Sequence, residues 1–440
     1  MGKNPMEQKE TGASQERRAV LAGVCLSDGE ASGAQGFEAS MRELASLAEA
    51  CGLEPAHTVT QNLDKVNIAT YMGPGKVEEL AAAVRGAGAS CVIFNDELTP
   101  SQTRNLADAL HCEVRDRTML ILDIFASRAR TTEARLQVEV ANLQYMLPRL
   151  TGLKKSLEQQ TGGVGTTNRG SGEKQLELNR RQIQDRIHSL ESELAQLVGQ
   201  RQQQRRRRRK AGVPVAALVG YTNAGKSTLL NALLERAGAP DEKRVLEKDM
   251  LFATLETSVR RIVLPDKLEF LLTDTVGFID RLPHHLVKAF RSTLEEVAEA
   301  DLLIQVVDCS QAGYREQMDV TRETLRELGA EDVPMLVAYN KADRADIRPF
   351  VREGEGVILS ARTGEGLDEL LALCRARLFG DLVRCALLIP YAESAAVDYL
   401  NRNARVISAE YRPEGTRLLL ECARRDFERL RRFAVEENPS

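Results

Sequence analysis

Residues 213–234 read VPVAALVGYTNAGKSTLLNALL, an apolar run followed by a glycine-rich turn and then a helical apolar pattern. The turn fits the pattern GxxxxGK[ST] between an expected strand and an expected helix, which is the setting of a phosphate-binding P-loop. In a P-loop, backbone N–H groups and the helix N-terminus bind phosphate, Lys226 reaches the β and γ oxygens, and Ser227 ligates Mg²⁺. The predicted phosphate-binding residues are Gly220, Tyr221, Thr222, Asn223, Ala224, Gly225, Lys226, Ser227 and Thr228.

Downstream of this stretch, apolar runs typical of buried strands alternate with helical patterns. The runs cover residues 259–264, 268–273, 302–308, 335–340 and 356–360. Alternation of this kind is typical of an α/β fold with a doubly wound sheet. We therefore predict a P-loop nucleotide-binding domain of this type, called the G domain below, over residues 212–380.

The sequence DTVG ends one of these strands and predicts a γ-phosphate sensor. Asp274 can hold Mg²⁺ through water, and the N–H of Gly277 can meet the γ-phosphate. Thr275 and Val276 are assigned to the same nucleotide site. The next residue, Phe278, occupies a position where a polar side chain usually orients the attacking water, and an aromatic ring cannot do that. We therefore expect slow hydrolysis by the isolated protein, with the water placed by other groups.

NKAD, residues 340–343, follows another strand and predicts a guanine site. Asp343 can accept the N1–H and the exocyclic amine of guanine. Adenine offers neither group, so a buried Asp343 would stay unpaired against ATP. Asn340 is expected to brace the loops and the Lys341 stem to cover the base, while the N–H groups of residues 360–362 face guanine O6. The predicted base-site residues are Asn340, Lys341, Ala342, Asp343, Ser360, Ala361 and Arg362.

A GTPase switch also needs a threonine whose hydroxyl completes the Mg²⁺ shell when the γ-phosphate is present. The segment MLFATLETSVRR, residues 250–261, offers Thr254 and Thr257. Their positions relative to the following strand do not decide between them, so both stay candidates on the residues alone.

The 440 residues exceed what one core usually holds. Changes of pattern divide them into five parts. These are a disordered tail (1–18), a small α/β domain (19–130), a helical arm (131–211), the G domain (212–380) and a small α+β domain (381–440).

The arm is predicted from apolar residues at helical and heptad spacing. Leu176, Ile183, Leu190 and Leu197 recur every seven residues. We predict a long antiparallel hairpin whose tip is the glycine-rich stretch 151–174 and whose second helix starts near residue 173.

Charge is unevenly distributed along the chain. The whole chain carries −4, whereas residues 145–210 contain fifteen Lys/Arg and six Asp/Glu, a net +9. A basic island in an acidic protein favours a polyanionic partner for that segment. The competing interpretation is a structural coiled coil that ends in a solvated basic linker.

The remaining composition excludes several classes of protein. The eight cysteines are scattered without a CxxC pair, which favours reduced, buried thiols over a zinc site. The sequence contains no apolar run of membrane-spanning length and no signal-peptide pattern, so we expect a cytoplasmic protein without stable membrane insertion.

Taken together, the motifs resemble those of the HflX family, ribosome-associated GTPases of the Obg and HflX group. The resemblance rests on GYTNAGKSTLLN (220–231), LFATLE (251–256), DTVGFIDRLPHHLVKAFRSTLEE (274–296), GPGKVEEL (73–80) and DRTMLILDIFASRARTTEARLQVEVANLQYMLPRL (116–150). It covers roughly residues 55–380. It implies that Thr254 is the switch ligand, and it assigns Phe252, Ala253, Leu255 and Glu256 to the nucleotide site with it.

The chain departs from the family at the arm tip, where it reads GGVGTTNRGSGEKQLELNRR (162–181). Two residues are added before Arg169, Ser171 replaces a proline and Lys174 replaces a threonine. The tip is therefore expected to be longer and more flexible than in the family.

The resemblance implies a GTPase that binds the large (50S) ribosomal subunit, splits or rescues stalled ribosomes, and is stimulated by them. Lys226, Thr254 and Gly277 would be catalytic, with Mg²⁺ as cofactor. Asn223 also stands where potassium-stimulated GTPases place a K⁺ ligand, although Thr222 replaces the proline of that pattern. We expect GTP, GDP and ribosomal RNA as partners, no DNA, and a monomer. The expected RNA contacts are Lys154, Lys155, Arg169, Arg180 and Arg181.

Two other functions stay open on the sequence. One is an RNA-remodelling, helicase-like activity that uses ATP in the N-terminal domain. The other is a regulatory GTPase switch that does not act on ribosomes. Stimulation of GTP turnover by ribosomes would separate the switch from the ribosomal factor.

Overall fold

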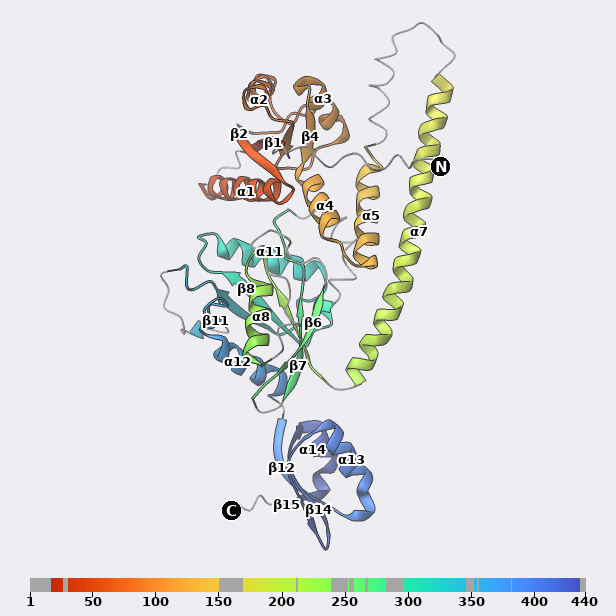
Figure 1. Cartoon of the computed structure of the whole chain (residues 1–440), viewed down its shortest axis with the longest axis vertical. Coiled ribbons are helices and arrows are strands. Elements are labelled where there is room, and N and C mark those ends of the chain that lie inside the picture. The colour runs from red at the N-terminus through yellow and green to blue at the C-terminus, as the bar shows by residue number, and fades with distance from the viewer. Residues whose placement is uncertain are drawn as a thin grey trace, which may run out of the picture. The chain divides into compact units, whose positions relative to one another are not determined.

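A computed structural model shows how these segments are arranged (Figure 1). It describes residues 17–26, 31–149, 169–210, 213–238, 252, 257–265, 268–281, 296–345, 352–353, 356–380 and 382–435. The chain forms two compact units. The first unit comprises Met1–Gln196, Lys248–Glu256 and Ile279–Arg291, and the second comprises Leu197–Glu247, Thr257–Phe278 and Ser292–Ser440. Two short segments from the predicted G domain therefore belong to the first unit.

The first unit is built on a parallel sheet with the strand order β2-β1-β3-β4. Its strands are β1 (Arg17–Leu26), β2 (Leu53–Leu63), β3 (Cys91–Phe94) and β4 (Glu113–Asp116). Because side chains alternate along a strand, β1 contributes to both faces of the sheet.

Two helices cover each face of this sheet. Val20 and Ala22 of β1 join the core beneath α2 (Pro74–Ala87) and α3 (Pro100–Leu110). On the opposite face, α1 (Ala31–Ala50) packs on β1 and β2 and contacts α4 (Arg117–Arg128). The α/β alternation predicted for this region is therefore present.

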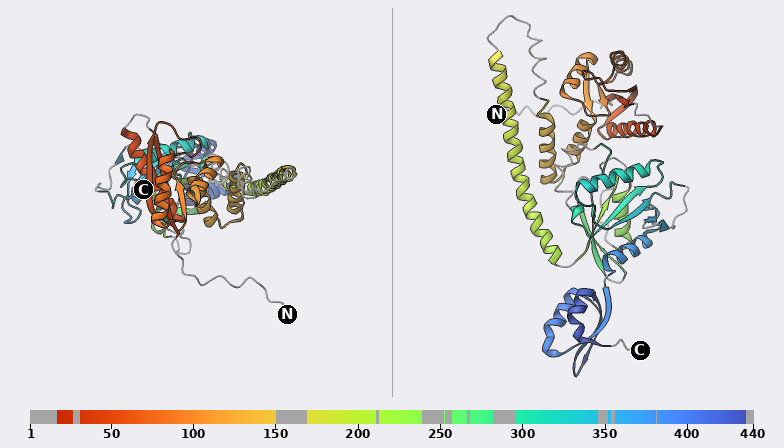
Figure 2. Two further views of the ribbon diagram at one scale, coloured as in Figure 1. Left: turned by 90° about the horizontal axis from the view of Figure 1, so that it is seen from above. Right: turned by 180° about the vertical axis from the view of Figure 1, so that it is seen from behind.

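The arm region contains α5 (Thr132–Met146) and α7 (Arg169–Lys210), which lie side by side in Figures 1 and 2. Leu190 of the predicted heptad pattern is buried, and so is Ile187, three residues before it. Polar contacts join Glu139 to Arg186 and Gln144 to Glu191.

The start of α7 corrects one prediction. The sequence placed residues 169–174 in the tip because Gly170 and Gly172 disfavour helix. In the structure these residues are helical from Arg169 onward. Once a helix is nucleated, each further residue adds a hydrogen bond, so a long helix can extend through two glycines.

The second unit contains a seven-stranded sheet with the order β10-β11-β9-β8-β5-β7-β6. Its strands are β5 (Val215–Val219), β6 (Ser258–Val263), β7 (Glu269–Asp274), β8 (Leu302–Asp308), β9 (Met335–Asn340), β10 (Arg352–Glu353) and β11 (Gly356–Ile358). The five inner strands are parallel, and the edge strands β6 and β10 are antiparallel to their neighbours. All five downstream apolar runs therefore form strands of one mixed sheet.

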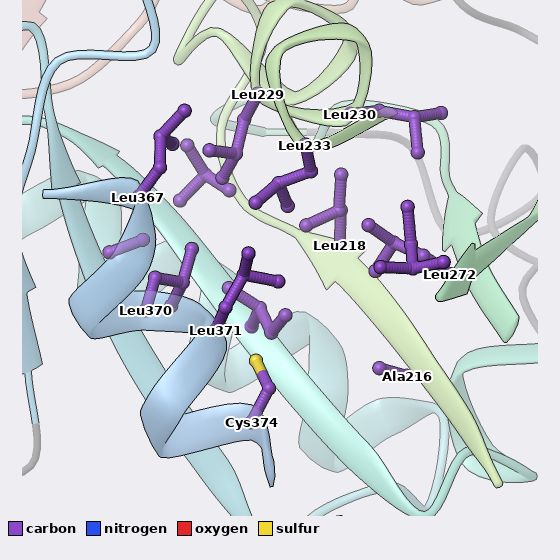
Figure 3. Close-up of a cluster of buried hydrophobic side chains, with 14 of the residues drawn as sticks. Ala216, Leu218, Leu229, Leu230, Leu233, Leu272, Leu367, Leu370, Leu371 and Cys374 are labelled. Atoms are coloured by element: carbon purple, nitrogen blue, oxygen red, sulfur yellow. The ribbon is translucent and has the colours of Figure 1, made fainter. Parts of the chain in front are cut away.

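Helices cover both faces of this sheet, as a doubly wound fold requires. Figure 3 shows leucines of α8 (Lys226–Arg236) and α12 (Leu367–Phe379) meeting over Leu218 of β5. On the other face, the buried side chain of Gln305 donates a hydrogen bond to the Met318 carbonyl of α11 (Tyr314–Glu327) at 3.2 Å.

The C-terminal part of the second unit has its own antiparallel sheet, with the order β13-β14-β12-β15. The strands are β12 (Leu382–Ile389), β13 (Arg405–Arg412), β14 (Gly415–Ala423) and β15 (Ala434–Val435). Leu400 of α13 (Ser394–Asn403) and Leu430 of α14 (Arg424–Leu430) complete its core. Along the chain these elements follow in the order β12, α13, β13, β14, α14 and β15, which is an α+β arrangement.

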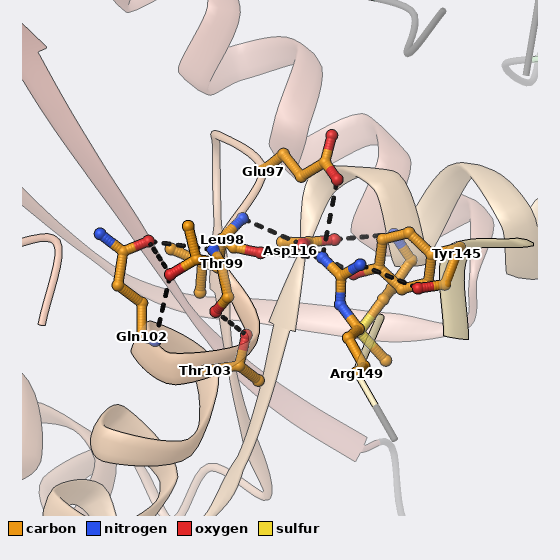
Figure 4. Close-up of polar contacts among 9 residues, drawn as sticks. Glu97, Leu98, Thr99, Gln102, Thr103, Asp116, Tyr145 and Arg149 are labelled. Atoms are coloured by element: carbon orange, nitrogen blue, oxygen red, sulfur yellow. Dashed lines mark hydrogen bonds and ion pairs between the residues drawn. The ribbon is translucent and has the colours of Figure 1, made fainter. Parts of the chain in front are cut away.

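A buried carboxylate ties α5 to the sheet of the first unit (Figure 4). Asp116 ends β4, and its Oδ1 accepts the Met119 N–H of α4 at 2.9 Å. Its Oδ2 accepts hydrogen bonds from the Tyr145 hydroxyl at 2.7 Å and the Leu98 N–H at 3.1 Å, and it pairs with Arg149 at 3.2 Å. The position of α5 is therefore set by hydrogen bonds to a charge that cannot stay unpaired in the interior.

Within the described ranges, no helix combines the length and the apolarity that a membrane crossing requires.

Candidate nucleotide-binding site

The P-loop connects β5 to α8 and turns sharply. Its backbone enters the left-handed region at Asn223 (φ 60°) and Gly225 (φ 94°). A side chain at Gly225 would clash with the Asn340 amide, so glycine is required there. Helix α8 begins directly afterwards at Lys226. The N–H groups and the positive dipole of its first turn therefore stand at the loop, where an anion is stabilised.

Lys226 is buried within this loop. Its ammonium group donates to the carbonyl oxygens of Gly220 at 3.0 Å and Tyr221 at 2.8 Å. Burial lowers the pKa of Lys226 to about 8, and the negative charge of Asp274 opposes that shift. The ammonium group of the lysine predicted to bind phosphate is thus held by two carbonyl groups at the start of the P-loop.

Two described residues that were predicted to hold Mg²⁺ lie together. These are Ser227, predicted as a direct ligand, and Asp274, predicted to act through water. Ser227 Oγ donates to Asp274 Oδ2 at 2.7 Å, because β7 neighbours β5 and ends beside the start of α8. A hydroxyl and a carboxylate oxygen are ligands that Mg²⁺ prefers. The donor set therefore fits this ion.

The residues of DTVG line the same end of the sheet. The Thr275 hydroxyl donates to the Leu218 carbonyl at 2.6 Å, and Val276 is buried. Gly277 lies against the P-loop, because an added Cβ would be 2.8 Å from Thr222 Cα and 3.0 Å from Lys226 Nζ. Gly277 therefore sits beside the lysine predicted to reach the γ-phosphate.

Phe278 uses its backbone to join this segment to the P-loop. The Phe278 N–H donates to the Gly220 carbonyl at 3.1 Å, and the Thr222 N–H donates to the Phe278 carbonyl at 2.7 Å. The Phe278 side chain is 2% exposed. Its ring therefore belongs to the core and leaves no side-chain group for orienting water.

Asn340 connects the three loops of the site. Its Nδ2 donates to the Ala224 carbonyl of the P-loop, and its Oδ1 accepts the Ala361 N–H, both at 2.9 Å. Lys341 Nζ donates to the Asn223 carbonyl at 2.8 Å. The predicted bracing by Asn340 therefore has a direct geometric basis.

Asp343 differs from the prediction in one respect. The sequence argument assumed a buried carboxylate. In the structure Asp343 is exposed, whereas its neighbour Ala342 is buried. Its Oδ1 accepts the Ser360 hydroxyl at 2.7 Å, and Ser360 itself is buried. Rejection of ATP therefore requires that the bound base itself buries the Asp343 carboxylate, so that a base without the matching donors leaves it unpaired. Arg362 is also exposed.

Of residues 252–256, which were assigned to the nucleotide site together, Phe252 alone lies within the described ranges, and the other candidate threonine, Thr257, is also described. Its ring packs edge-on against Phe125 of α4 in the first unit, with centroids 4.7 Å apart and planes at 84°. The Phe252 side chain is thus a core group, and its part in nucleotide binding stays a prediction. The assignments that lie outside the described residues are Ala253, Thr254, Leu255 and Glu256.

The predicted RNA contacts are only partly described. Lys154 and Lys155 lie outside the described residues, and Arg169 begins α7 without a described side chain. Arg180 and Arg181 are exposed on α7.

Asp308 is a member of the site that the sequence reasoning missed. It ends β8 opposite Asn340 of β9, and its Oδ2 lies 2.8 Å from Lys341 Nζ. Burial opposes ionisation of Asp308, but hydrogen bonds from Lys341 and Ser310 outweigh it and lower its pKa. The available signal was an aspartate that ends an apolar strand, as Asp274 does.

Comparison with known proteins gives three family matches. Residues 38–126 match "GTP-binding GTPase N-terminal", residues 128–208 match "GTP-binding GTPase Middle Region", and residues 215–341 match "50S ribosome-binding GTPase".

Individual relatives extend over nearly the whole chain. The chain is 45% identical over 403 residues to a GTPase HflX of Lacrimispora saccharolytica, covering 91% of this chain and 92% of the relative. It is 42% identical to GTPase HflX of Escherichia coli, covering 80% and 82%. A GDP-bound GTP-binding protein of Sulfolobus solfataricus matches with 24% identity and a TM-score of 0.41, covering 82% of this chain and 98% of that one.

Proposed function

The chain belongs to the HflX family of GTPases, and on that basis we propose that it binds the large ribosomal subunit and splits or rescues stalled ribosomes. It binds GTP and GDP and hydrolyses GTP, as its relatives and its GTPase domain indicate. The observation that best supports the ribosomal role is the match of residues 215–341 to a 50S ribosome-binding GTPase.

We assign the phosphate site to residues 220–228 and the guanine site to residues 340–343 and 360–362. The assignment is supported by the hydrogen bonds of Asn340, which tie the two loops together. Lys226 and Gly277 are proposed to stabilise charge on the γ-phosphate as it is transferred to water. Thr254 is proposed as the switch threonine, as the family pattern implies.

Mg²⁺ is proposed to be held by Ser227 and Thr254 and, through water, by Asp274. When bound it neutralises charge on the phosphates. The pairing of Ser227 with Asp274 at 2.7 Å supports this choice of residues.

The arm is proposed to be an antiparallel hairpin of α5 and α7 that contacts ribosomal RNA. Support comes from the net charge of +9 over residues 145–210 and from the exposure of Arg180 and Arg181 on α7. Contacts between basic side chains and phosphates would supply affinity by counterion release and would read little sequence.

Cosedimentation with large subunits in the presence of a nonhydrolysable GTP analogue tests this proposal. Reversing charge at Arg180 and Arg181 to glutamate should reduce association at least tenfold, while the affinity for GDP stays unchanged. The matched control reverses Arg322 and Arg326, two exposed arginines of α11. That variant should travel with the subunit as the wild type does.

An assay of GTP turnover with and without ribosomes separates the ribosomal role from a regulatory switch. Ribosomes should raise GTP turnover severalfold or more, and a flat response would favour a regulatory switch that does not act on ribosomes. The same assay run with and without K⁺ tests the proposed role of Asn223 as a K⁺ ligand.

A further inference from the structure

The chain passes from one compact unit to the other within residues 274–281, which begin with the DTVG motif. These residues are called the switch segment below. Phe278 belongs to the second unit, where its backbone is bonded to the P-loop. The next residue, Ile279, belongs to the first unit. The end of the segment that carries Gly277 is therefore held by a part of the chain outside the predicted G domain.

Arg117 makes the first of two contacts that hold this end. It is the first residue of α4, and its guanidinium donates to the Asp280 carbonyl at 3.1 Å. The Arg117 side chain is 3% exposed, is paired with Glu43 of α1, and donates to Asn95 Oδ1 at 3.2 Å. Because the guanidinium is a rigid fork fixed by these partners, it sets where the Asp280 carbonyl can lie.

Asp96 makes the second contact, one residue further along. Its carboxylate pairs with Arg281 and also accepts the Tyr71 hydroxyl. Arg281 is half exposed and has a φ of 53°, an uncommon backbone conformation for a residue other than glycine. Exposed ion pairs add little stability. This pair therefore has more effect on the path of the chain than on the stability of the fold.

We propose that Arg117 and Asp96 are positioning residues for GTP hydrolysis. By holding Asp280 and Arg281 they restrict the path of the chain that directly follows Gly277 and Phe278. The inference rests on the proposed role of Gly277. Since Phe278 offers no side-chain group to orient water, hydrolysis depends on backbone placement, which a small displacement of the segment disturbs.

Steady-state hydrolysis of GTP by the full-length protein tests this role. Arg281→Ala and Asp96→Asn should each lower kcat about threefold to tenfold. The KM for GTP and the Kd for GDP should stay within about twofold, because the P-loop and the guanine loops are untouched. The control is Arg236→Ala, which breaks the pair between Asp368 and an arginine about as exposed as Arg281. That variant should retain the wild-type kcat.

A double-mutant cycle separates positioning from general damage. If Arg281 and Asp96 act as one contact, the double variant Arg281→Ala, Asp96→Asn should be no slower than the slower single variant. Arg117→Lys keeps a charge beside Glu43 but loses the fork, so it should also lower kcat. Its melting temperature shows whether the fold is retained.

Gly277→Ala distinguishes failure of this inference from failure of the site assignment. The added Cβ would meet Thr222 and Lys226, so this variant should lose hydrolysis. Inactive Gly277→Ala together with wild-type kcat in the three positioning variants would overturn the positioning role and leave the site standing. Normal hydrolysis by Gly277→Ala would overturn the site itself. A higher kcat in the positioning variants would also overturn the proposal, because the contacts would then restrain the switch.

Discussion

Single residues of the P-loop are held by partners far away in the sequence. Asn340 fills the space beside Gly225 and bonds to the Ala224 carbonyl. Lys226 is desolvated by the same packing, which lowers its pKa to about 8. Phosphate binding should reverse that shift, because a nearby negative charge favours the protonated amine.

Proton uptake on binding GTP follows from the lowered pKa of Lys226. At pH 8 about half of the free protein carries a neutral amine, so binding should take up about half a proton per site. The uptake should fall as the pH drops below 8, because the amine is then already charged. Calorimetric titration in buffers of different ionisation enthalpy measures it. Binding heats at pH 8 that do not depend on the buffer would contradict the shift.

At the scale of the elements, buried carboxylates at strand ends determine how helices are attached. Asp116 caps α4 and accepts a hydrogen bond from Tyr145 of α5 (Figure 4). Burial, together with the charge of Asp116, raises the pKa of Tyr145, so its phenol stays protonated and can donate. The C-terminal end of α5 is therefore tied to the sheet by hydrogen bonds in addition to apolar contact.

Tyr145→Phe should destabilise the first unit by about 1–3 kcal/mol, because it leaves a buried acceptor with one fewer donor. Urea unfolding followed by hydrogen exchange of the two units would measure the change. Tyr399→Phe removes a similar hydroxyl, which donates to Asp426 at 3.0 Å in the second unit. That control should leave the unfolding of the first unit unchanged. Equal effects of both variants on the first unit would contradict this account.

At the scale of the whole molecule, charge is unevenly distributed along the sequence, and the chain passes more than once between the two compact units. A net charge of −4 contains a segment of +9. Residues 248–256 and 279–291 belong to the first compact unit, although the residues on either side of them belong to the second. The basic segment and the nucleotide site are thus different parts of the chain, and their contributions to ribosome binding can be varied separately.

Association with the large subunit should depend on salt in proportion to the number of phosphates that the arm binds. Reversing Arg180 and Arg181 should reduce the slope of log K against log salt by about 1 for each phosphate that the variant no longer binds. Subunit binding measured at several KCl concentrations gives the slope. A variant that binds more weakly with an unchanged slope would mean that these arginines do not bind phosphates.

The sequence by itself determined the location of the P-loop, the strands of the seven-stranded sheet other than β10, and the order of the motifs. These features depend on local chemistry, since a glycine turn, an alternating strand and a capping residue each act over a few positions. Phe278 could be identified from the sequence as unable to orient water for the same reason.

Only the tertiary structure decided which distant groups meet. Asp96 and Arg281 are 185 residues apart, Arg117 and the Asp280 carbonyl are 163 apart, and Phe125 meets Phe252. An apolar or charged residue in a pattern shows that it needs a partner, but packing of the complete chain selects the partner. The sequence therefore predicted a nucleotide site, and the fold alone showed which side chains contact Asp280 and Arg281 after its DTVG motif.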